Sequence, residues 1–231
     1  MKKITKYIPT IILTLLCSCS DYLDIVPDNV TTLDIVFNNR NTAERYLANC
    51  YHFVPDHGSV KRIPGMGAGH ECWFYTTNDS HFDNEVSFYI ARGLQNIDAP
   101  YANYWDGEGG SNLPMFRAIR ECNIFLDYVR DQHKVNDLTD SERKRWIAEV
   151  NVLKAYYHFF LFEHYGPIPI VDKALPVSTD PEGVKVTRMP VDQIVDYMVK
   201  LIDDSYKDLP PVITMEAVSY THLTLPTTSR V

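Results

Sequence analysis

The stretch from Thr139 to Pro167 constrains the fold more than any other part of this sequence. It opens with Thr139-Asp-Ser-Glu142, the capping-box spacing in which two side chains satisfy free amides at a helix start. It closes with Gly166-Pro167, a pair that ends helices. The apolar residues between them recur at helical spacing and predict one buried face: Trp146, Ile147, Val150, Leu153, Tyr157, Phe160 and Leu161. The stretch therefore predicts one long helix that packs against other elements.

Two earlier segments combine a start signal with an apolar stripe in the same way. The first has capping-box spacing at Asn41-Thr-Ala-Glu44. Its stripe consists of Tyr46, Leu47, Cys50, Tyr51 and Val54. The second starts near Pro114, because proline suits the first turn of a helix. Its inward face is predicted to contain Met115, Ile119, Cys122, Leu126 and Val129.

A fourth helix is expected from Pro190 to Leu209, where Pro210-Pro211 closes it. Its inward residues are predicted to be Val191, Ile194, Val195, Met198, Leu201 and Ile202. No segment alternates between polar and apolar residues for long enough to suggest a sheet, so the expected class is mainly α. Ile168–Val171 is expected to be extended, because proline disfavours helix in the residue before it.

Two long connections, at roughly residues 55–113 and 166–188, separate these helices. Connections of that length without structure in a compact domain are usually functional or disordered. The first does not have a disordered composition, because it is rich in aromatic residues: Trp73, Phe74, Tyr75, Phe82, Phe88, Tyr89, Tyr101, Tyr104 and Trp105.

The N-terminus has the layout of a secretory signal, with lysines at positions 2, 3 and 6 followed by an apolar run. Leu16-Cys17-Ser18-Cys19 then resembles a bacterial lipobox, which implies cleavage after Ser18 and acylation of Cys19. Cys17 is the weaker candidate because the bulky Leu16 precedes it. An ordinary secretion signal with incidental cysteines is the alternative. Two or three acyl chains are enough to hold a soluble domain at a bilayer.

The composition of the chain after residue 18 limits the classes of partner that it can bind. The formal charge is -8, and loss of the three lysines in residues 1–18 makes it about -11. Such an acidic chain argues against nucleic acid, whose phosphates require a basic surface. The other cysteines, Cys50, Cys72 and Cys122, are odd in number, which excludes a complete disulfide framework. We expect Cys50 and Cys122 to act as small apolar residues on helix faces.

Several segments, in order, resemble landmarks of the SusD/RagB family. They are Cys19-Ser-Asp-Tyr-Leu-Asp24, TAERYLANCY (42–51), YANYWDGEGGSNLPMFRAIRECNIFL (101–126), EVNVLKAYYHFFLFEHYGPIPIV (149–171) and RMPVDQIVDYMVKLIDDSYKDLP (188–210). The most specific is the helix that runs into Tyr165-Gly166-Pro167-Ile168-Pro169, since the family has an alanine- and tyrosine-rich helix ending in an aromatic-glycine-x-proline turn. The resemblance covers about 190 residues.

The resemblance implies an outward-facing lipoprotein of the outer membrane in Bacteroidota. Such proteins have a helical scaffold with tetratricopeptide-like helix pairs. They cap a TonB-dependent SusC-like transporter, capture glycans or in some members peptides, and have no catalytic centre or cofactor. Members are about twice this length, so we expect residues 19–217 to form an incomplete family fold. The resemblance transfers no sugar-binding residue by position.

The last residues, 218–231, depart from the family pattern. VSYTHLTLPTT resembles one reading frame of a sequencing adapter, and the segment carries no charge before Arg230. We expect this tail to be non-native, and a genuine β-like tail is the alternative.

Three motifs suggest chemistry that their context does not support. Asn78–Glu85 concentrates three carboxylates and a histidine, but it lacks the frame of a calcium loop, and a solvated acidic loop fits better. Gly65-Met-Gly67-Ala-Gly69 suggests a phosphate loop, yet the glycine spacing is wrong and a turn is expected. His70 and Cys72 have no second pair at zinc spacing, so no metal site is expected.

The aromatic residues of the first long connection are the better candidates for ligand capture. A sugar ring has one face dominated by C–H groups, which a tryptophan or tyrosine plane buries well. The candidates are Trp73, Tyr75, Tyr101, Tyr104 and Trp105. The alternative for them, and most of all for Tyr104 and Trp105, is packing onto the scaffold.

The sequence thus predicts a transporter-associated binding lipoprotein that is not an enzyme. Two other classes stay open. A lipid-anchored glycoside hydrolase would need two carboxylates that converge in a cleft. A structural or adhesive surface protein would show no saturable affinity for soluble oligosaccharides.

Overall fold

The computed structural model describes residues 32–58, 64–69, 86–108, 113–176 and 185–211. The chain divides into two compact units, residues 1–36 and 37–231. In the described part of the first unit, α2 (Leu33–Val36) is a single helical turn. The backbone amides of Ile35 and Val36 both donate to the carbonyl of Thr32 at 3.1 Å, which starts the turn.

All regular secondary structure in the described part of the second unit is helical. It contains, in order, α3 (Arg40–Tyr51), α4 (Pro64–Gly67), α5 (Val86–Ala91), α6 (Met115–Arg130), α7 (Asp140–Tyr165), α8 (Val191–Asp203) and the 3₁₀ helix η2 (Tyr206–Asp208). No strand occurs among the described residues, so the expected mainly α class is confirmed.

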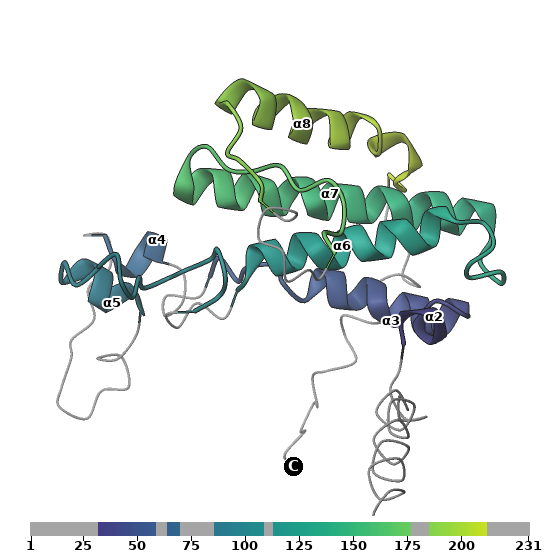
Figure 1. The fold of residues 1–231 in the computed structure, drawn as a ribbon, viewed down its shortest axis with the longest axis horizontal. Coiled ribbons are helices and arrows are strands. Elements are labelled where there is room, and N and C mark those ends of the chain that lie inside the picture. The colour runs from purple at the N-terminus through teal and green to yellow at the C-terminus, as the bar shows by residue number, and fades with distance from the viewer. Residues whose placement is uncertain (1–31, 59–63, 70–85, 109–112, 177–184, 212–231) are drawn as a thin grey trace, which may run out of the picture. The chain divides into compact units, whose positions relative to one another are not determined.

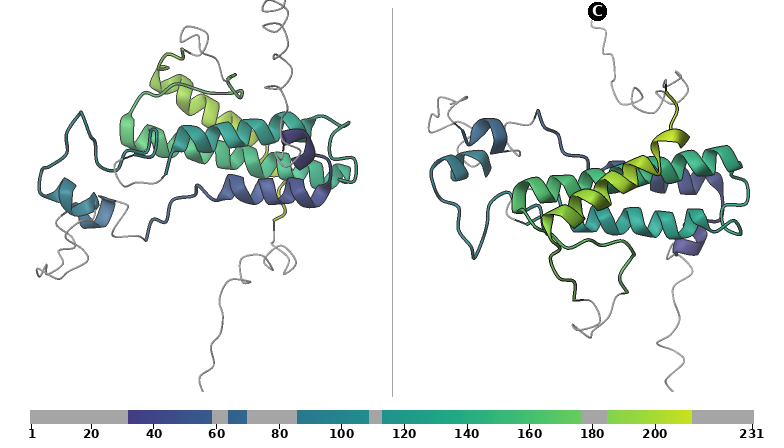
Figure 2. Two further views of the ribbon diagram at one scale, coloured as in Figure 1. Left: turned by 60° about the horizontal axis from the view of Figure 1, so that its bottom comes forward. Right: turned by 90° about the horizontal axis from the view of Figure 1, so that it is seen from above.

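Helices α6 and α7 lie side by side, and α7 runs back along α6 after a short connection (Figure 1). Helix α3 packs against both of them, while α8 packs on α7 (Figures 1 and 2). The central helix α7 therefore has neighbours on several sides. It buries polar residues as well as apolar ones, among them Arg143, Asn151, Lys154 and His158.

Both predicted ends of α7 are confirmed. The Thr139 hydroxyl accepts from the Glu142 amide at 3.3 Å, and the Glu142 carboxylate accepts from the Thr139 amide at 3.3 Å. At the other end, Gly166 has a φ of 67° and donates its amide to the Phe162 carbonyl. A side chain at this position would be strained, which is why glycine ends the helix here.

Helix α6 also agrees with its prediction, since Met115, Ile119, Cys122, Leu126 and Val129 are all buried. Arg143 fastens the connection between α6 and α7. Its guanidinium donates to the carbonyls of Val129 at 2.6 Å and Val135 at 3.0 Å. The Val129 carbonyl lies in the last turn of α6, where no amide of the helix can reach it, and Val135 lies in the connection, so the buried arginine supplies partners that the helix cannot.

The predicted start of α3 is wrong. The N-cap is Asn39, whose side chain accepts from the Thr42 amide, and Asn41 lies inside the helix. The amide of Arg40 donates to the Asp137 carboxylate at 2.7 Å, so a tertiary contact fixes the first turn. The predicted stripe is partly correct, because Leu47 and Cys50 are buried whereas Tyr51 and Val54 are exposed.

Helix α8 is shorter and less buried than expected. It ends at Asp203 rather than Leu209, and a turn and η2 follow. Ile194 and Met198 are buried, but three residues predicted to face inward are exposed: Val191, Val195 and Ile202. The reason is that, among the described helices before it, α8 packs only on α7, which covers a narrow strip of its surface.

The core between α3, α6 and α7 is aromatic. Phe37 stacks on Tyr128 with ring centroids 4.5 Å apart, and Phe125 packs against both Phe37 and Trp146. Cys50 and Cys122 are buried and unpaired within this core, which confirms that they act as small apolar residues.

The first long connection contains less irregular structure than predicted, whereas the described part of the second is irregular. The first includes α4 and α5, which were not expected. In the second, residues 168–171 form neither a helix nor a strand, and the Ile168 carbonyl accepts from the Met189 amide at 3.0 Å. Across the part of the chain that the structure describes, no helix has the length and apolar character needed to span a bilayer.

Candidate ligand-binding site

Several predicted site residues lie outside the described residues. These are Cys19, Trp73 and Tyr75, together with the acidic segment 78–85 and the pair His70 and Cys72. Their roles stay predictions. The glycine-rich motif is partly described, and its residues 65–67 belong to the short helix α4.

Tyr101 lies in a folded loop, with its ring already in contact with another. It stacks on Tyr89 with centroids 4.6 Å apart and an interplanar angle of 18°. The side chain of Gln95 accepts from the Tyr101 amide at 2.6 Å and donates to its carbonyl at 2.9 Å. A ligand could use only the face of Tyr101 that Tyr89 leaves open.

Tyr104 is part of the core, with 1% of its surface exposed. Its ring meets Phe160 and His164 edge to face, at centroid distances of 4.9 and 4.8 Å. Burial raises the pKa of its hydroxyl, since the charged form would be poorly solvated. The geometry of Tyr104 is that of the packing alternative, because a ligand cannot reach this ring without a rearrangement.

Trp105 is half-buried and stands at the edge of the scaffold. Phe116 and Tyr165 contact it edge to face, with centroids 4.6 and 5.5 Å away. The guanidinium carbon of Arg188 lies 5.1 Å from the ring centroid. The Trp105 amide donates to the Asn103 side chain at 3.1 Å, which holds the backbone beneath the ring.

A groove of about 320 Å³ opens beside Trp105. It is lined by Trp105, Phe116, Arg120, Pro169, Val171, Lys173, Leu175 and Val186. Helix α6 supplies Phe116 and Arg120, which share a face because they are four residues apart. The remaining wall comes from the chain between α7 and α8, so three separate segments build the groove.

The wall segment after α7 is tied to the helices at several points. The Asn123 side chain donates to the Val171 carbonyl at 3.0 Å, and the Lys154 ammonium donates to the Asp172 carbonyl at 3.0 Å. Arg120 donates to the Leu175 carbonyl. These bonds hold an irregular segment in place, so the groove is formed without a ligand.

The pKa values of Lys154, His158 and Asp172, in the network behind this wall, are shifted. Burial lowers the pKa of Lys154 and lowers that of His158 to about 4. Burial acts to raise the pKa of Asp172, but hydrogen bonds from Lys154 and Tyr197 outweigh it and the pKa is lowered. All three lie outside the groove lining, so these shifts describe the support of the site.

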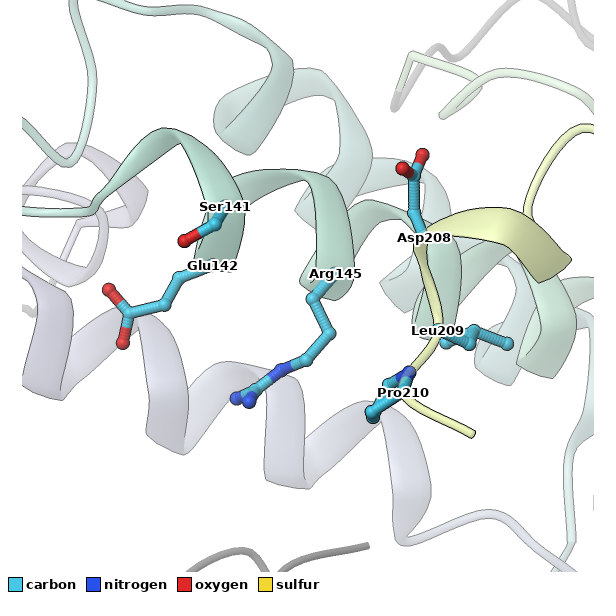
Figure 3. A pocket seen from close by; sticks show the side chains of 6 residues that line it. All are labelled: Ser141, Glu142, Arg145, Asp208, Leu209 and Pro210. Carbon is cyan, nitrogen blue, oxygen red and sulfur yellow. The ribbon is translucent and has the colours of Figure 1, made fainter. Parts of the chain in front are cut away.

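A second, smaller hollow of about 240 Å³ lies between the first turns of α7 and the chain after α8 (Figure 3). Glu142 and Arg145 line it on one side and Asp208 on the other. Figure 3 shows that the two carboxylates point in different directions. Glu142 is bonded to Arg40, and Arg145 lies 3.3 Å from Glu149, so the charges of α7 here already have partners.

Metal binding finds no support in the described ranges, where no three histidine, cysteine or acidic side chains gather at one point. Residues 70–85, which contain the acidic segment, lie outside the described residues.

Comparison with protein families identifies the scaffold around this groove. A SusD-like family model, described as starch-binding associating with outer membrane, matches residues 21–228. The chain belongs to the SusD-like family. Comparison with the curated proteins finds no match.

Solved SusD-like structures share the fold. A laminarin binding SusD-like protein superposes with a TM-score of 0.58 at 17% identity, over 78% of this chain and 36% of that one. A SusD-like protein from Bacteroides fragilis gives 0.58 at 16% identity, over 80% and 32%. A SusD-like carbohydrate binding protein from Bacteroides vulgatus gives 0.51 at 14% identity, over 77% and 37%. The chain spans about a third of the length of these proteins.

Sequence reasoning named Trp105 but missed its neighbours in the groove. Phe116 and Arg120 follow it in the next helix, and Lys173 and Arg188 come much later in the chain. The packing of α6 against α7 and the hydrogen bonds from Arg120 and Asn123 to the segment after α7 bring these residues together, and no local sequence pattern predicts such long-range contacts.

Proposed function

We propose that this SusD-like protein is an outer-membrane surface lipoprotein that captures glycans and delivers them to a TonB-dependent SusC-like transporter. The family match over residues 21–228 carries the proposal, since that family is described as starch-binding and associated with the outer membrane. Acylated Cys19 is its proposed anchor, and the binding domain faces the exterior. The protein acts by binding and is not an enzyme.

The groove beside Trp105 is the proposed contact for part of the glycan. Its aromatic wall, Trp105 and Phe116, suits the C–H face of a sugar ring. The polar groups of Arg120 and Lys173 can donate to sugar hydroxyls. Small-molecule sites usually measure about 300–1,000 Å³. The groove is at the lower end of that range, so it fits a short portion of a chain.

Trp73 and Tyr75 are proposed as further contacts along the glycan. A longer ligand needs more than one aromatic platform, and both residues belong to the same aromatic connection as Trp105. Tyr101 can contribute through the face that Tyr89 leaves open.

The test is calorimetric titration of the purified protein against a panel of soluble polysaccharides and oligosaccharides. Saturable binding to at least one glycan, without release of reducing sugar, is the expected result. Release of reducing ends would support the hydrolase alternative. Absence of saturable binding across the panel would favour a structural or adhesive protein and would contradict the proposal.

The anchor and the transporter are tested separately in cells. Metabolic labelling with a clickable palmitate is expected to mark the protein, and a Cys19→Ala change is expected to abolish the label. Affinity purification from detergent-solubilised outer membranes is expected to recover a TonB-dependent barrel with the tagged protein. Labelling that persists in the Cys19→Ala variant would place the lipid elsewhere.

A further inference from the structure

The groove beside Trp105 is locally basic although the chain as a whole is acidic. Arg120 and Lys173 line it, and the Arg188 guanidinium lies over the Trp105 ring. None of the described residues that line it is acidic, whereas the formal charge of the whole chain is -8. A concentration of positive charge on such a chain calls for an explanation.

These three cations differ from several others in the described part of the second unit. Arg40, Arg145, Lys154 and Lys200 each face a carboxylate within 4.0 Å: Glu142, Glu149, Asp172 and Asp204 respectively. Within the described residues, no such ion pair forms at Arg120, Lys173 or Arg188.

Arg120 and Lys173 in the groove, and Arg188 over the Trp105 ring, instead meet neutral partners or solvent. Arg120 donates to the carbonyl of Leu175, and Arg188 donates to the carbonyl of Pro167 at 2.7 Å. Lys173 is exposed. A carbonyl orients a guanidinium but does not neutralise it, so the positive charge is retained at the groove.

Two carboxylates adjacent in the sequence to groove residues accept hydrogen bonds from other groups. Asp172 accepts from Lys154 at 2.8 Å and from Tyr197 at 2.9 Å. Asp106, which follows Trp105, accepts from the Asn103 side chain and the Glu108 amide. Neither aspartate lines the groove.

We infer that the groove selects an acidic sugar, with the anionic group of the sugar between Arg120 and Lys173 and the ring against Trp105 and Phe116. This inference rests on the proposed function and names its ligand class. A carboxylate on a uronic acid and a sulfate ester share the required chemistry, since both accept charge-assisted hydrogen bonds from guanidinium and ammonium groups.

The physical advantage of an anion is specific to this site. Hydrogen bonds between charged partners are roughly twice as strong as those between neutral ones. Arg120 is half-buried, so its attraction to an anion is screened less than at an open surface. A neutral sugar gains the aromatic contact and the weaker hydrogen bonds to its hydroxyls, whereas an acidic sugar gains the aromatic contact and charge-assisted hydrogen bonds.

Calorimetry at pH 7 with trigalacturonate and maltotriose as probes tests the inference. Trigalacturonate is expected to bind at least tenfold more tightly in 50 mM NaCl, and this preference is expected to shrink in 500 mM NaCl. A sulfated oligosaccharide forms a further arm. Tight binding of either acidic probe supports the inference. The comparison of the two probes identifies whether the groove binds a carboxylate or a sulfate ester.

Variants that remove one positive charge each test which residues cause the preference for the acidic probe. Lys173→Gln is expected to weaken binding of the acidic probe at least fivefold and to weaken binding of maltotriose much less, because a glutamine amide can still donate to a hydroxyl. Arg120→Gln is expected to act in the same direction, but it also loses the bond to Leu175, so its thermal unfolding is compared with that of the unmodified protein. Lys200→Gln is the matched control, because this exposed lysine lies on α8 outside the groove.

The inference and the proposed function can fail separately. If maltotriose or another neutral glycan binds as tightly as the acidic probes, the protein captures glycans but the inference is wrong. Binding of an acidic probe that is unaffected by Lys173→Gln and Arg120→Gln also overturns the inference. If no glycan of any kind binds, the proposed function fails and the inference fails with it.

Discussion

The ammonium of Lys154 lies 2.8 Å from the Asp172 carboxylate, and the two side chains differ sharply in exposure. The lysine side chain is 1% exposed, whereas the aspartate side chain is 64% exposed. The buried Lys154 therefore depends on Asp172 for a counter-ion, whereas the exposed Asp172 does not depend on Lys154. Without Asp172, the buried ammonium would lose its only carboxylate partner among the described residues. Without Lys154, the aspartate could still be solvated.

This asymmetry predicts unequal costs for the two single substitutions. Asp172→Ala is expected to destabilise the fold by about 3 kcal/mol, because it leaves a buried charge without its counter-ion. Lys154→Met is expected to cost about 1 kcal/mol or less, because it also removes the penalty for burying the charge. Urea denaturation of both variants measures the difference. A larger loss for Lys154→Met would show that the ion pair itself stabilises the protein.

How far the sequence predicts this structure depends on whether the signals are local. The ends of α7 were predictable because Thr139, Glu142 and Gly166 act on the backbone beside them. The start of α3 was not, because the Asp137 carboxylate that binds the Arg40 amide comes from a distant connection. The exposed face of α8 was also missed, since an apolar stripe does not say how much of it a neighbour covers.

Some residues of the candidate site could likewise be predicted from the sequence, and others could not. The aromatic composition of the first connection pointed to Trp105, but only the structure separates it from buried Tyr104 next to it. The basic half of the groove was unpredictable. Arg120 and Lys173 are more than fifty residues apart, and each is an ordinary surface-type residue in its own segment.

The buried, neutral ring of His158 is expected to lower the stability of the folded protein at acid pH. Its Nδ1 donates to the Lys154 carbonyl at 2.7 Å, and its Nε2 faces the Val171 amide, so the ring is held neutral. Burial lowers its pKa from 6.5 to about 4. Above pH 6.5 both the folded and unfolded states are neutral at this ring. Between pH 6.5 and 4 only the unfolded state binds the proton, so stability falls with falling pH.

The expected loss from His158 is up to about 3 kcal/mol between pH 7 and pH 4. Denaturation at several pH values measures it, with a His158→Gln variant as the reference. The difference in stability between the two proteins isolates the histidine from Lys154, Asp172 and Tyr197, which titrate or pair nearby. A parallel pH dependence in both proteins would contradict the prediction.

Gly166 is expected to tolerate no side chain. Its φ of 67° is rarely adopted by other residues, although a Cβ there would meet nothing within 4 Å. Gly166→Ala should therefore destabilise the protein by roughly 1–3 kcal/mol through backbone strain alone. Gly65→Ala is the matched control, because that position has equal space and no positive φ. Equal melting temperatures for the two variants would contradict this account.

Thr139 is expected to stabilise the start of α7 through its hydroxyl. Removal of the capping oxygen in Thr139→Ala should cost about 1 kcal/mol, since the Glu142 amide loses its acceptor. Thr139→Ser keeps the oxygen and should restore most of the stability. Chemical denaturation compares the three proteins, and a serine variant as unstable as the alanine variant would exclude a capping role.

The most direct test of the account is the affinity of Trp105→Ala for the glycan that the unmodified protein binds. We expect the loss of the ring to weaken binding by more than about 1 kcal/mol, as at an aromatic anchor. Tyr206→Ala, which removes a 56% exposed aromatic ring outside the groove, should leave the affinity unchanged. Equal affinities of the Trp105→Ala variant and the unmodified protein would contradict the proposal that this groove holds the ligand.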